Sequence, residues 1–380
     1  MRPMVDLRTQ YLQIREEVDR NIAEVIENTA FINGPQVKAF TAELETYLGD
    51  GVQVIPCANG TDALQIAMMA LDLKPGDELI TASFTYVATA EAIALLRLTP
   101  VLVDVDPITF ALDPEQVKAA IGPRTKAIVP VHLFGQCAPM DPLLELAREH
   151  NLYVIEDTAQ AIGATYLHAD GRQSKAGTMG DIGCTSFFPS KNLGCYGDGG
   201  ALFTRNAALA DRIRKVANHG QSVQYHHDEI GVNSRLDSLQ AAVLRAKLPH
   251  LDRYNSTRAA AAATYNRILG ASPWLSVPAT APYTTHVFHQ YTLVLHPDLH
   301  RQTLRDALAE RGVSSMIYYP IPLHHQKAYL DPRYTEGAFP VTEDLCRLVL
   351  SLPIHSELSE EAAAEIAHLV LDALATCLNP

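Results

Sequence analysis

Apolar and polar residues alternate along the first half of the chain in blocks of two kinds, which predict helices and short buried strands. Short apolar runs recur between longer segments whose apolar residues are three or four positions apart. This alternation is typical of β-α-β crossovers, which build a mostly parallel sheet with helices on both faces. The predicted helices span residues 61–72, 86–96, 114–121 and 141–149, and the predicted strands span 78–81, 100–104, 126–131 and 152–156.

The same pattern extends in both directions from this block. An amphipathic helix is predicted over residues 9–29, and Asn33-Gly34-Pro35 ends it because Gly and Pro break helices. An apolar run at residues 52–56 follows. Further strands are predicted near 183–188 and 200–204, and helices over 206–217 and 236–247.

The order of elements changes near residue 254. An alanine-rich helix over 254–269 leads away from the sheet, and a proline-containing connector follows it. We therefore predict two domains, a large one at residues 1–254 that includes the N-terminal helix and a smaller α+β one at residues 255–380. The smaller domain is predicted to contain a strand-like run at 287–295, a helix at 301–311, a strand at 313–318, and helices near 340–349 and 360–377.

Composition narrows the classes of function. The chain has 380 residues, of which 47% are hydrophobic and 19% charged, as in a folded globular protein. Its formal charge of −13 argues against a nucleic-acid or membrane-surface partner. No apolar segment is long enough to span a membrane, and no secretory signal precedes the first helix. We expect a cytoplasmic protein with free thiols, because its six cysteines form no CxxC pair.

Most familiar site motifs are missing from the chain. It contains neither GxxxxGK[ST] nor a GxGxxG between a strand and a helix, so the alternating pattern alone predicts no nucleotide site. The sequence His226-His227-Asp228-Glu229 lies in a predicted polar loop, and adjacent residues rarely converge on one ion. We predict no metal site.

Two segments stand out as candidates for chemistry. The predicted strand ending in Glu156-Asp157 places an acid where ligands sit in open α/β sheets, although an acid there is also a common helix N-cap. The second segment presents Lys191 after Phe187, Phe188 and Pro189, an apolar setting that favours a neutral, nucleophilic amine. The alternative for Lys191 is a stem packed over aromatic rings with its head in water. Most of the other lysines lie on predicted polar helix faces or turns, where solvation explains them.

Two further features support a reactive lysine. The stretch beginning Asn59-Gly60-Thr61 opens a helix, so the backbone N–H groups of Gly60 and Thr61 are placed to bind a phosphate. Tyr86 supplies an aromatic ring. A phosphate cup, a ring stacker, an acid for a pyridine nitrogen at Asp157 and an amine at Lys191 are the groups that pyridoxal phosphate needs.

At these residues the chain resembles the DegT/DnrJ/EryC1/StrS sugar aminotransferases, a family with the aspartate-aminotransferase-like (fold type I) architecture. The resemblance runs from Val5 to Pro353, and departures at Thr158 and at residues 222–224 do not touch the chemistry. It implies an α/β large domain with a mostly parallel sheet between helices and a smaller C-terminal α+β domain. The similar strings are CANGTDALQ (57–65), FTYVATAE (84–91), CTSFFPSKNLGCYGDGGA (184–201), HGQ (219–221) and GVNSRLDSLQAA (231–242).

The resemblance also implies a role for each site residue. Lys191 binds the cofactor covalently and moves protons, and Asp157 binds the pyridinium nitrogen. It further implies a homodimer with shared active sites and places Tyr318 where a histidine is expected. The remaining roles are Tyr86 stacking on the ring, Gln160 beside the 3-oxygen of the ring, Gly60, Thr61 and Ser186 at the phosphate, Asn233 at the phosphate of the partner subunit's cofactor, and Arg235 and Tyr319 at the substrate.

The implied reaction moves the amino group of L-glutamate to a nucleotide-linked keto sugar. The substrate expected first is UDP-2-acetamido-2-deoxy-3-oxo-D-glucuronate, for bacterial surface polysaccharide (O-antigen) synthesis. A dTDP- or UDP-linked 3- or 4-keto deoxyhexose is the alternative acceptor. A dehydratase of the same family would replace Lys191, typically by histidine. A non-catalytic regulator that binds pyridoxal phosphate is the alternative from a different class, although no basic DNA-binding extension is present.

Overall fold

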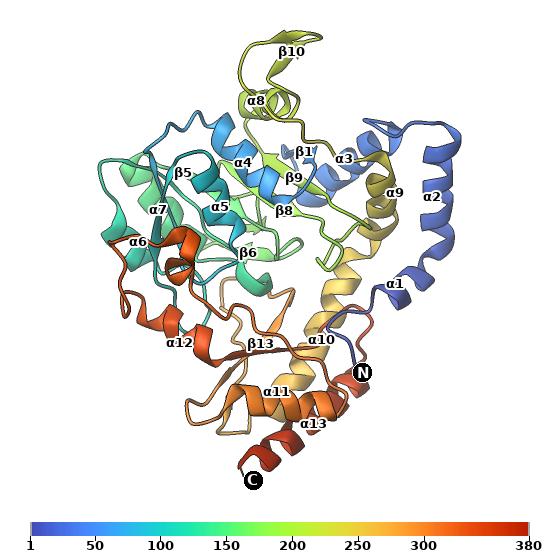
Figure 1. The fold of residues 1–380 in the computed structure, drawn as a ribbon. Coiled ribbons are helices and arrows are strands. Elements are labelled where there is room, and N and C mark those ends of the chain that lie inside the picture. Colours follow the sequence, from blue (N-terminus) through green and yellow to red (C-terminus); the bar gives the residue numbers. More distant parts are fainter. Residues whose placement is uncertain (1, 379–380) are drawn as a thin grey trace.

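A seven-stranded sheet organises the first two thirds of the chain in the structure, a computed structural model that describes residues 2–378 (Figure 1). The strand order is β1-β9-β8-β5-β4-β2-β3. Strands β8, β5, β4, β2 and β3 run parallel, whereas β9 is antiparallel to both of its neighbours. The sheet consists of β1 (Gln53–Cys57), β2 (Glu78–Ala82), β3 (Thr99–Val103), β4 (Thr125–Ile128), β5 (Tyr153–Asp157), β8 (Ile182–Ser186) and β9 (Gly200–Thr204).

Helices cover both faces of this sheet, as predicted, because its strands are apolar on both sides. Helices α4, α5 and α8 share one apolar core with the strands, and α6 and α7 share another. The order of helices and strands follows the predicted alternation, with ends displaced by a few residues. These helices are α4 (Gly60–Ala70), α5 (Ala88–Leu95), α6 (Pro114–Ala120), α7 (Met140–His150), α8 (Ala207–Ala217) and α9 (Ser238–Lys247), and a short 3-10 turn, η1 (Leu133–Gly135), precedes α7.

The N-terminal segment differs from the prediction. The single helix expected over 9–29 is wrong: α1 (Leu7–Gln13) and α2 (Arg15–Glu27) meet at Ile14, whose φ of −121° interrupts the helix. A helix that was not predicted, α3 (Pro35–Leu48), follows. Gly34 and Pro35 end the preceding segment, but Pro is also favoured at the first position of a helix, and here it begins the next one.

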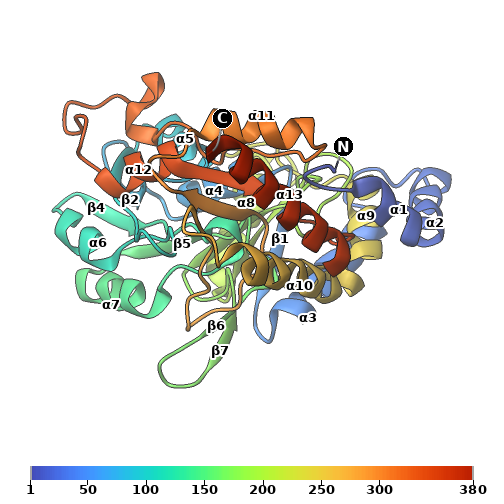
Figure 2. The ribbon, with the colours of Figure 1, turned by 90° about the horizontal axis from the view of Figure 1, so that it is seen from below.

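The C-terminal part of the chain has a second, antiparallel sheet in the order β12-β13-β14. Apolar side chains between Ala259 and Leu378 form a core of their own around it, and Figure 2 shows α10 and α13 side by side. The division at residue 254 stays a prediction. The elements are α10 (Leu251–Leu269), which the 3-10 turn η2 (Leu248–His250) precedes, β12 (Leu275–Ser276), β13 (Tyr291–Leu295), α11 (Arg301–Glu310), η3 (Leu323–His325), η4 (Lys327–Tyr329), α12 (Pro340–Leu348), β14 (Val349–Leu352) and α13 (Glu360–Leu378).

The strand predicted over 313–318 is wrong. The segment forms two isolated bridges instead of a continuous strand. Val313 pairs with Arg2, whose N–H donates to the Gly312 carbonyl at 2.7 Å, and Met316 pairs with Ser351 of β14. The third strand is instead β14, directly after α12. Its four side chains are buried, with Leu350 and Leu352 in the core of the C-terminal part, and the sequence shows them only as the continuation of a helical pattern.

Two short hairpins also escaped prediction, β6 (Thr165–Leu167) with β7 (Gln173–Lys175), and β10 (Gln221–Val223) with β11 (His226–His227). The second projects from the top of the molecule in Figure 1 and contains part of the sequence expected to be a loop. Its groups do not converge: Glu229 pairs with Arg212 at 3.1 Å, and the His227 ring contacts the His219 carbonyl. All six cysteines are free. Between residues 2 and 378, no helix combines the length and apolar character that a membrane span requires.

Candidate active site

A cavity of about 650 Å³ opens at the carboxyl ends of the parallel strands. Strand β5 ends there with Asp157 and β8 with Ser186, and α4 begins there. Ligands of open α/β sheets bind at this edge. The cavity collects every predicted site residue except Asn233 and Arg235: Gly60, Thr61, Tyr86, Asp157, Gln160, Ser186, Lys191 and Tyr319.

One end of the cavity has the geometry of a phosphate cup. Asn59 caps α4 by accepting a hydrogen bond from the Asp62 N–H at 2.8 Å, and the first N–H groups of the helix, on Gly60 and Thr61, have no acceptor within the helix. A Cβ at position 60 would lie 2.7 Å from the Ser186 Cβ, so only glycine fits here. A phosphate bound at this end would meet backbone donors, the Ser186 hydroxyl and the positive end of a helix dipole.

Asp157 occupies the middle of the cavity floor and is 7% exposed. Its Oδ2 accepts a hydrogen bond from the Thr89 hydroxyl at 2.8 Å, and its Oδ1 accepts one from the Ala159 N–H at 3.1 Å. No α-helix begins at Asp157, so the alternative interpretation as an α-helix N-cap is wrong. A carboxylate held at two points beside a ring-sized space fits the partner of a pyridine nitrogen.

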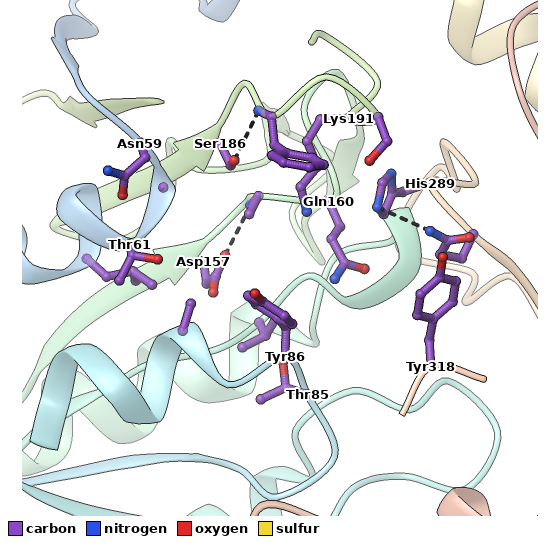
Figure 3. A pocket seen from close by; sticks show the side chains of 18 of the residues that line it. Asn59, Thr61, Thr85, Tyr86, Asp157, Gln160, Ser186, Lys191, His289 and Tyr318 are labelled. Carbon is purple, nitrogen blue, oxygen red and sulfur yellow. Dashed lines mark hydrogen bonds between the residues drawn. The ribbon is translucent and has the colours of Figure 1, made fainter. Parts of the chain in front are cut away.

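Gln160 and Tyr86 complete the middle of the cavity (Figure 3). The Gln160 amide accepts from the Phe134 N–H at 2.8 Å and donates to the Tyr319 hydroxyl at 3.0 Å. The Tyr86 ring is 56% exposed at the cavity, with its centre 6.1 Å from that of Tyr319. Tyr86 therefore offers an open aromatic face, whereas Gln160 connects the sheet to the C-terminal part of the chain.

Lys191 reaches into the same space from the loop that joins β8 to β9 (Figure 3). The loop turns tightly, since the Lys191 N–H donates to the Phe188 carbonyl at 2.8 Å. Burial lowers the pKa of the Lys191 amine to about 8, against the opposing effect of the Asp157 charge. A substantial fraction of this amine is therefore neutral near physiological pH, as a nucleophile requires.

One other lysine departs from the expectation of a solvated side chain. Lys247 is 1% exposed on α9, and its ammonium donates to the Gly194 carbonyl at 2.7 Å behind the loop that bears Lys191. The predicted helix over 236–247 has polar as well as apolar residues, so the sequence around Lys247 gave no sign of this burial. Lys247 is therefore an exception to the prediction that solvation explains most of the other lysines.

Asn233 and Arg235 lie outside the cavity of their own chain. Between them, the Ser234 hydroxyl accepts from the Ala58 N–H at 3.0 Å and donates to Asp62 at 2.6 Å, which fixes this segment beside the phosphate cup. Asn233 is exposed. From the sequence alone, Arg235 could instead pair with Asp237 or with another surface acid; within residues 2–378 it forms no ion pair with either, and its side chain is partly buried.

Several cavity residues were not found from the sequence. His289 and Gln290 lie in a run read only as a strand. Thr89, which is buried behind the cavity lining and holds Asp157, is hidden in an apolar helix. Two adjacent polar residues interrupt that apolar run, and this was the one available signal for His289 and Gln290. Tyr318, where a histidine was expected, also lines the cavity.

Comparison with known proteins gives a consistent result along the whole chain. The model of the DegT/DnrJ/EryC1/StrS aminotransferase family matches residues 12–371. A "pleiotropic regulatory protein" of Geobacillus stearothermophilus is 45% identical over 94% of this chain and 95% of its own. The UDP-N-acetyl-3-dehydro-alpha-D-glucosamine 3-aminotransferase of Acidithiobacillus ferrooxidans is 46% identical over 97% and 96%. The UDP-2-acetamido-2-deoxy-3-oxo-D-glucuronate aminotransferase of Pseudomonas aeruginosa is 45% identical over 92% and 94%.

A solved structure agrees with the fold in detail. DesV of S. venezuelae, crystallised in complex with a ketimine intermediate, superimposes with a TM-score of 0.92 at 41% identity, over 97% of both chains. The similarity therefore extends over both the large sheet and the C-terminal unit.

Proposed function

The chain belongs to the DegT/DnrJ/EryC1/StrS aminotransferase family, and from this premise we propose that it moves the amino group of L-glutamate to C3 of UDP-2-acetamido-2-deoxy-3-oxo-D-glucuronate. The family depends on pyridoxal 5′-phosphate, and the cavity fits that cofactor. One observation carries the catalytic part of the proposal. A lysine amine with a lowered pKa faces a carboxylate and a phosphate cup across a single cavity.

Each cavity residue has a defined task in this reaction. Bound pyridoxal phosphate supplies an aldehyde that takes up amino groups and a ring that accepts electrons from the substrate carbon. Gly60, Thr61 and Ser186 hold the phosphate. Asp157, fixed by Thr89, holds the positive charge of the ring nitrogen, and the Lys191 amine takes the proton from the substrate carbon.

The charges around the cavity support a homodimer with shared sites. Glutamate and a uronate both bring carboxylates, yet within the described residues Lys191 is the one Lys or Arg side chain that lines the cavity. Among the described residues Arg235 has no ion-pair partner. It follows Ser234, which is bonded to Ala58 and Asp62 beside the phosphate cup, and Asn233 on the other side of Ser234 is exposed. We propose that a second copy of the chain brings both residues into this site. Its Arg235 then binds the carboxylate of the uronate in bidentate fashion.

The neutral sugar UDP-N-acetyl-3-dehydro-glucosamine is a second candidate acceptor. The relative from Acidithiobacillus ferrooxidans is named for it and is as similar to this chain as the uronate enzyme. Tyr318 stands where the resemblance expects a histidine, which favours a changed contact on that side of the cavity. A non-catalytic regulator, suggested by the name of the Geobacillus relative, would have no need for a reactive Lys191.

The two half-reactions test the proposed function separately. Enzyme loaded with pyridoxal phosphate is mixed with L-glutamate, and the change in cofactor absorbance reports transfer of the amino group from glutamate to the cofactor. The aminated enzyme is then offered the UDP-linked 3-oxo uronate, its neutral analogue, and a dTDP-linked 4-keto deoxyhexose, with mass spectrometry of the products. We expect amination of a UDP-linked 3-oxo sugar. No response to glutamate or to any other amino acid would favour the regulator.

The uronate has its own test in Arg235→Ala. If Arg235 binds the sugar carboxylate, this change weakens amination of the oxo-uronate by roughly 1.5–3 kcal/mol and leaves the glutamate half-reaction nearly intact. An equal loss in both half-reactions would mean that Arg235 binds glutamate or supports the interface. Use of the neutral sugar with unchanged efficiency in the variant would agree with a carboxylate-specific role.

We also propose that the enzyme acts in the cytoplasm, in the synthesis of a bacterial surface polysaccharide such as O-antigen. The free cysteines support a reducing compartment. An amino sugar linked to UDP is an activated building block, and detection of the product in cell extracts that depends on this protein would test the assignment.

A further inference from the structure

The two ends of the cavity come from different parts of the chain. The groups that fit the cofactor, from Gly60 to Lys191, lie on the strands, loops and helix of the large sheet. The opposite wall consists of His289 and Gln290, which precede β13, and of Tyr318, which follows α11. Figure 3 shows Asn59 and Thr61 on one side of the site and His289 and Tyr318 on the other, with Lys191 and Asp157 between them. This wall therefore lies on the side of Lys191 and Asp157 that is away from the phosphate cup.

The wall is polar but carries no charge. Burial, together with the positive charges of Lys191 and Arg258, holds the pKa of His289 well below its usual range, so its imidazole is neutral. Burial also raises the pKa of the Tyr318 phenol, which stays protonated. The charged groups among the described residues of the cavity lining are Asp157, Lys191 and Asp198, and none of them belongs to this wall.

The wall has an unused hydrogen-bonding group at His289, whereas the Tyr318 phenol interacts with the Gln290 side chain. The His289 and Gln290 side chains meet only at 3.4 Å between nitrogens, at the long end of the hydrogen-bond range. His289 is 6% exposed, and its Nδ1 has no partner between residues 2 and 378. Buried polar groups are normally paired, and those of a binding site are paired by the ligand.

Uncharged donors and acceptors discriminate between classes of ligand. A hydroxyl or acetamido group can both donate and accept, and so can an amide, a neutral imidazole and a phenol. A carboxylate only accepts, and its burial against a wall without a cation is costly. Both carboxylates of glutamate are therefore poorly suited to this wall, whereas the uncharged substituents of a sugar fit it.

We propose that His289, Gln290 and Tyr318 form the acceptor subsite, which binds the hydroxyl and acetamido substituents of the keto sugar and does not contact the glutamate donor. This assignment rests on the proposed function, since it concerns the second substrate of the same site. It applies to the uronate and to its neutral analogue alike, because both carry these substituents.

His289→Phe is the direct test, since it keeps a ring in the wall and removes both nitrogens. In the loaded enzyme we expect about a tenfold lower kcat/KM for amination of the UDP-linked keto sugar, and a change within about twofold for the glutamate half-reaction. Calorimetric titration of the amino-sugar product is the second readout. The dissociation constant should rise by a similar factor.

His286→Phe is the matched control. His286 is a buried imidazole three residues away that stacks on Phe288 at 3.8 Å, accepts a hydrogen bond from the Phe288 N–H, and does not line the cavity. It should affect both half-reactions equally, and weakly. Equal losses in both half-reactions of His289→Phe, or no loss in either, overturn the subsite.

Failure of the proposed function looks different from failure of the subsite. Wild-type enzyme that takes an amino group from glutamate and passes it to no nucleotide-linked keto sugar overturns the function, and the acceptor subsite with it. Wild-type enzyme that aminates the sugar, together with a His289→Phe variant that does so equally well, overturns the subsite alone.

Discussion

The loop between β8 and β9 has a lysine on each of its two faces, Lys191 partly buried and Lys247 fully buried. Lys191 belongs to the loop and faces the cavity, whereas Lys247 reaches the opposite face from α9. Burial lowers the pKa of each amine to about 8. The two lysines differ in their neighbours, because Lys247 donates to the Gly194 carbonyl at 2.7 Å and lies 4.5 Å from the centre of the Tyr196 ring.

This difference shows that a lowered pKa does not by itself identify a reactive lysine. Lys247 has no access to the cavity, and its amine is engaged by a carbonyl and an aromatic face. Lys191 lies within the cavity that also holds Asp157, the phosphate cup and Tyr86. Reactivity therefore depends on open space and on the groups that share it. We call the side of the loop that bears Lys191 the cavity face and the side that Lys247 contacts the packed face. The packed face helps to hold the cavity face in position.

The largest expected effect comes from Lys191→Ala. This variant should bind pyridoxal phosphate without a covalent link and lose roughly 1,000-fold or more in turnover, because one residue supplies both the covalent attachment and the proton transfer. Absorbance of the cofactor and trapping with borohydride check the attachment. Borohydride trapping of the cofactor on Lys247 in this variant would break the comparison, because the packed face would then be reachable.

The sequence revealed the cavity face of this loop and not its packed face. Lys191, Asp157 and Gly60 are recognisable because their signals are local: an aromatic loop, a strand end and a helix start. Lys247 and Thr89 act through partners at Gly194 and Asp157 that lie far away along the chain. Contacts of this kind depend on packing between elements, which hydrophobic periodicity does not encode.

The fold shows the same division between local and distant information. The parallel sheet was predictable because each β-α-β unit repeats one local pattern. The strand expected over 313–318 was wrong, because this segment makes only single bridges, at Val313 to Arg2 and at Met316 to Ser351, and no periodicity near residue 313 reports these distant partners. The acceptor wall at His289 was missed for a related reason, since a polar pair inside an apolar run has meaning only beside the cavity.

The next effect, about tenfold, is expected in the rate of covalent cofactor attachment as the pH is raised, and it tests whether Lys191 is set apart by its lowered pKa. With a pKa of about 8, the neutral fraction of Lys191 rises roughly tenfold between pH 7 and pH 9 and then levels off. The rate constant for covalent attachment of pyridoxal phosphate to apoenzyme, followed by stopped-flow absorbance, should follow that curve. An amine with an ordinary pKa near 10.4 would instead give a rise of about 100-fold with no plateau. That result would mean that the cavity does not desolvate Lys191.

The smallest effect on catalysis is expected from Lys247→Met, which keeps an unbranched side chain on the packed face and removes its charge. We expect turnover within about threefold of the wild type, because Lys247 touches the loop and not the reacting groups. Its signature lies in stability instead. Between the folded pKa of about 8 and the ordinary value, the folded state binds fewer protons than the unfolded state, so wild-type stability rises with pH across that window.

The Met variant lacks this titration, so the difference in thermal midpoint should move in favour of the wild type as the pH is raised from 7.5 to 10. The measurement uses loaded enzyme at one protein concentration, because the cofactor and subunit association also stabilise the folded state. Lys247→Arg keeps the charge through this range and should show the same flat profile as Met, since arginine does not titrate there.

A Met variant that keeps the wild-type pH profile of stability would show that Lys247 is solvated. A variant that loses turnover as severely as Lys191→Ala would show that the two faces of the loop act as one catalytic unit, because loss of the Gly194 contact alone would then have displaced Lys191.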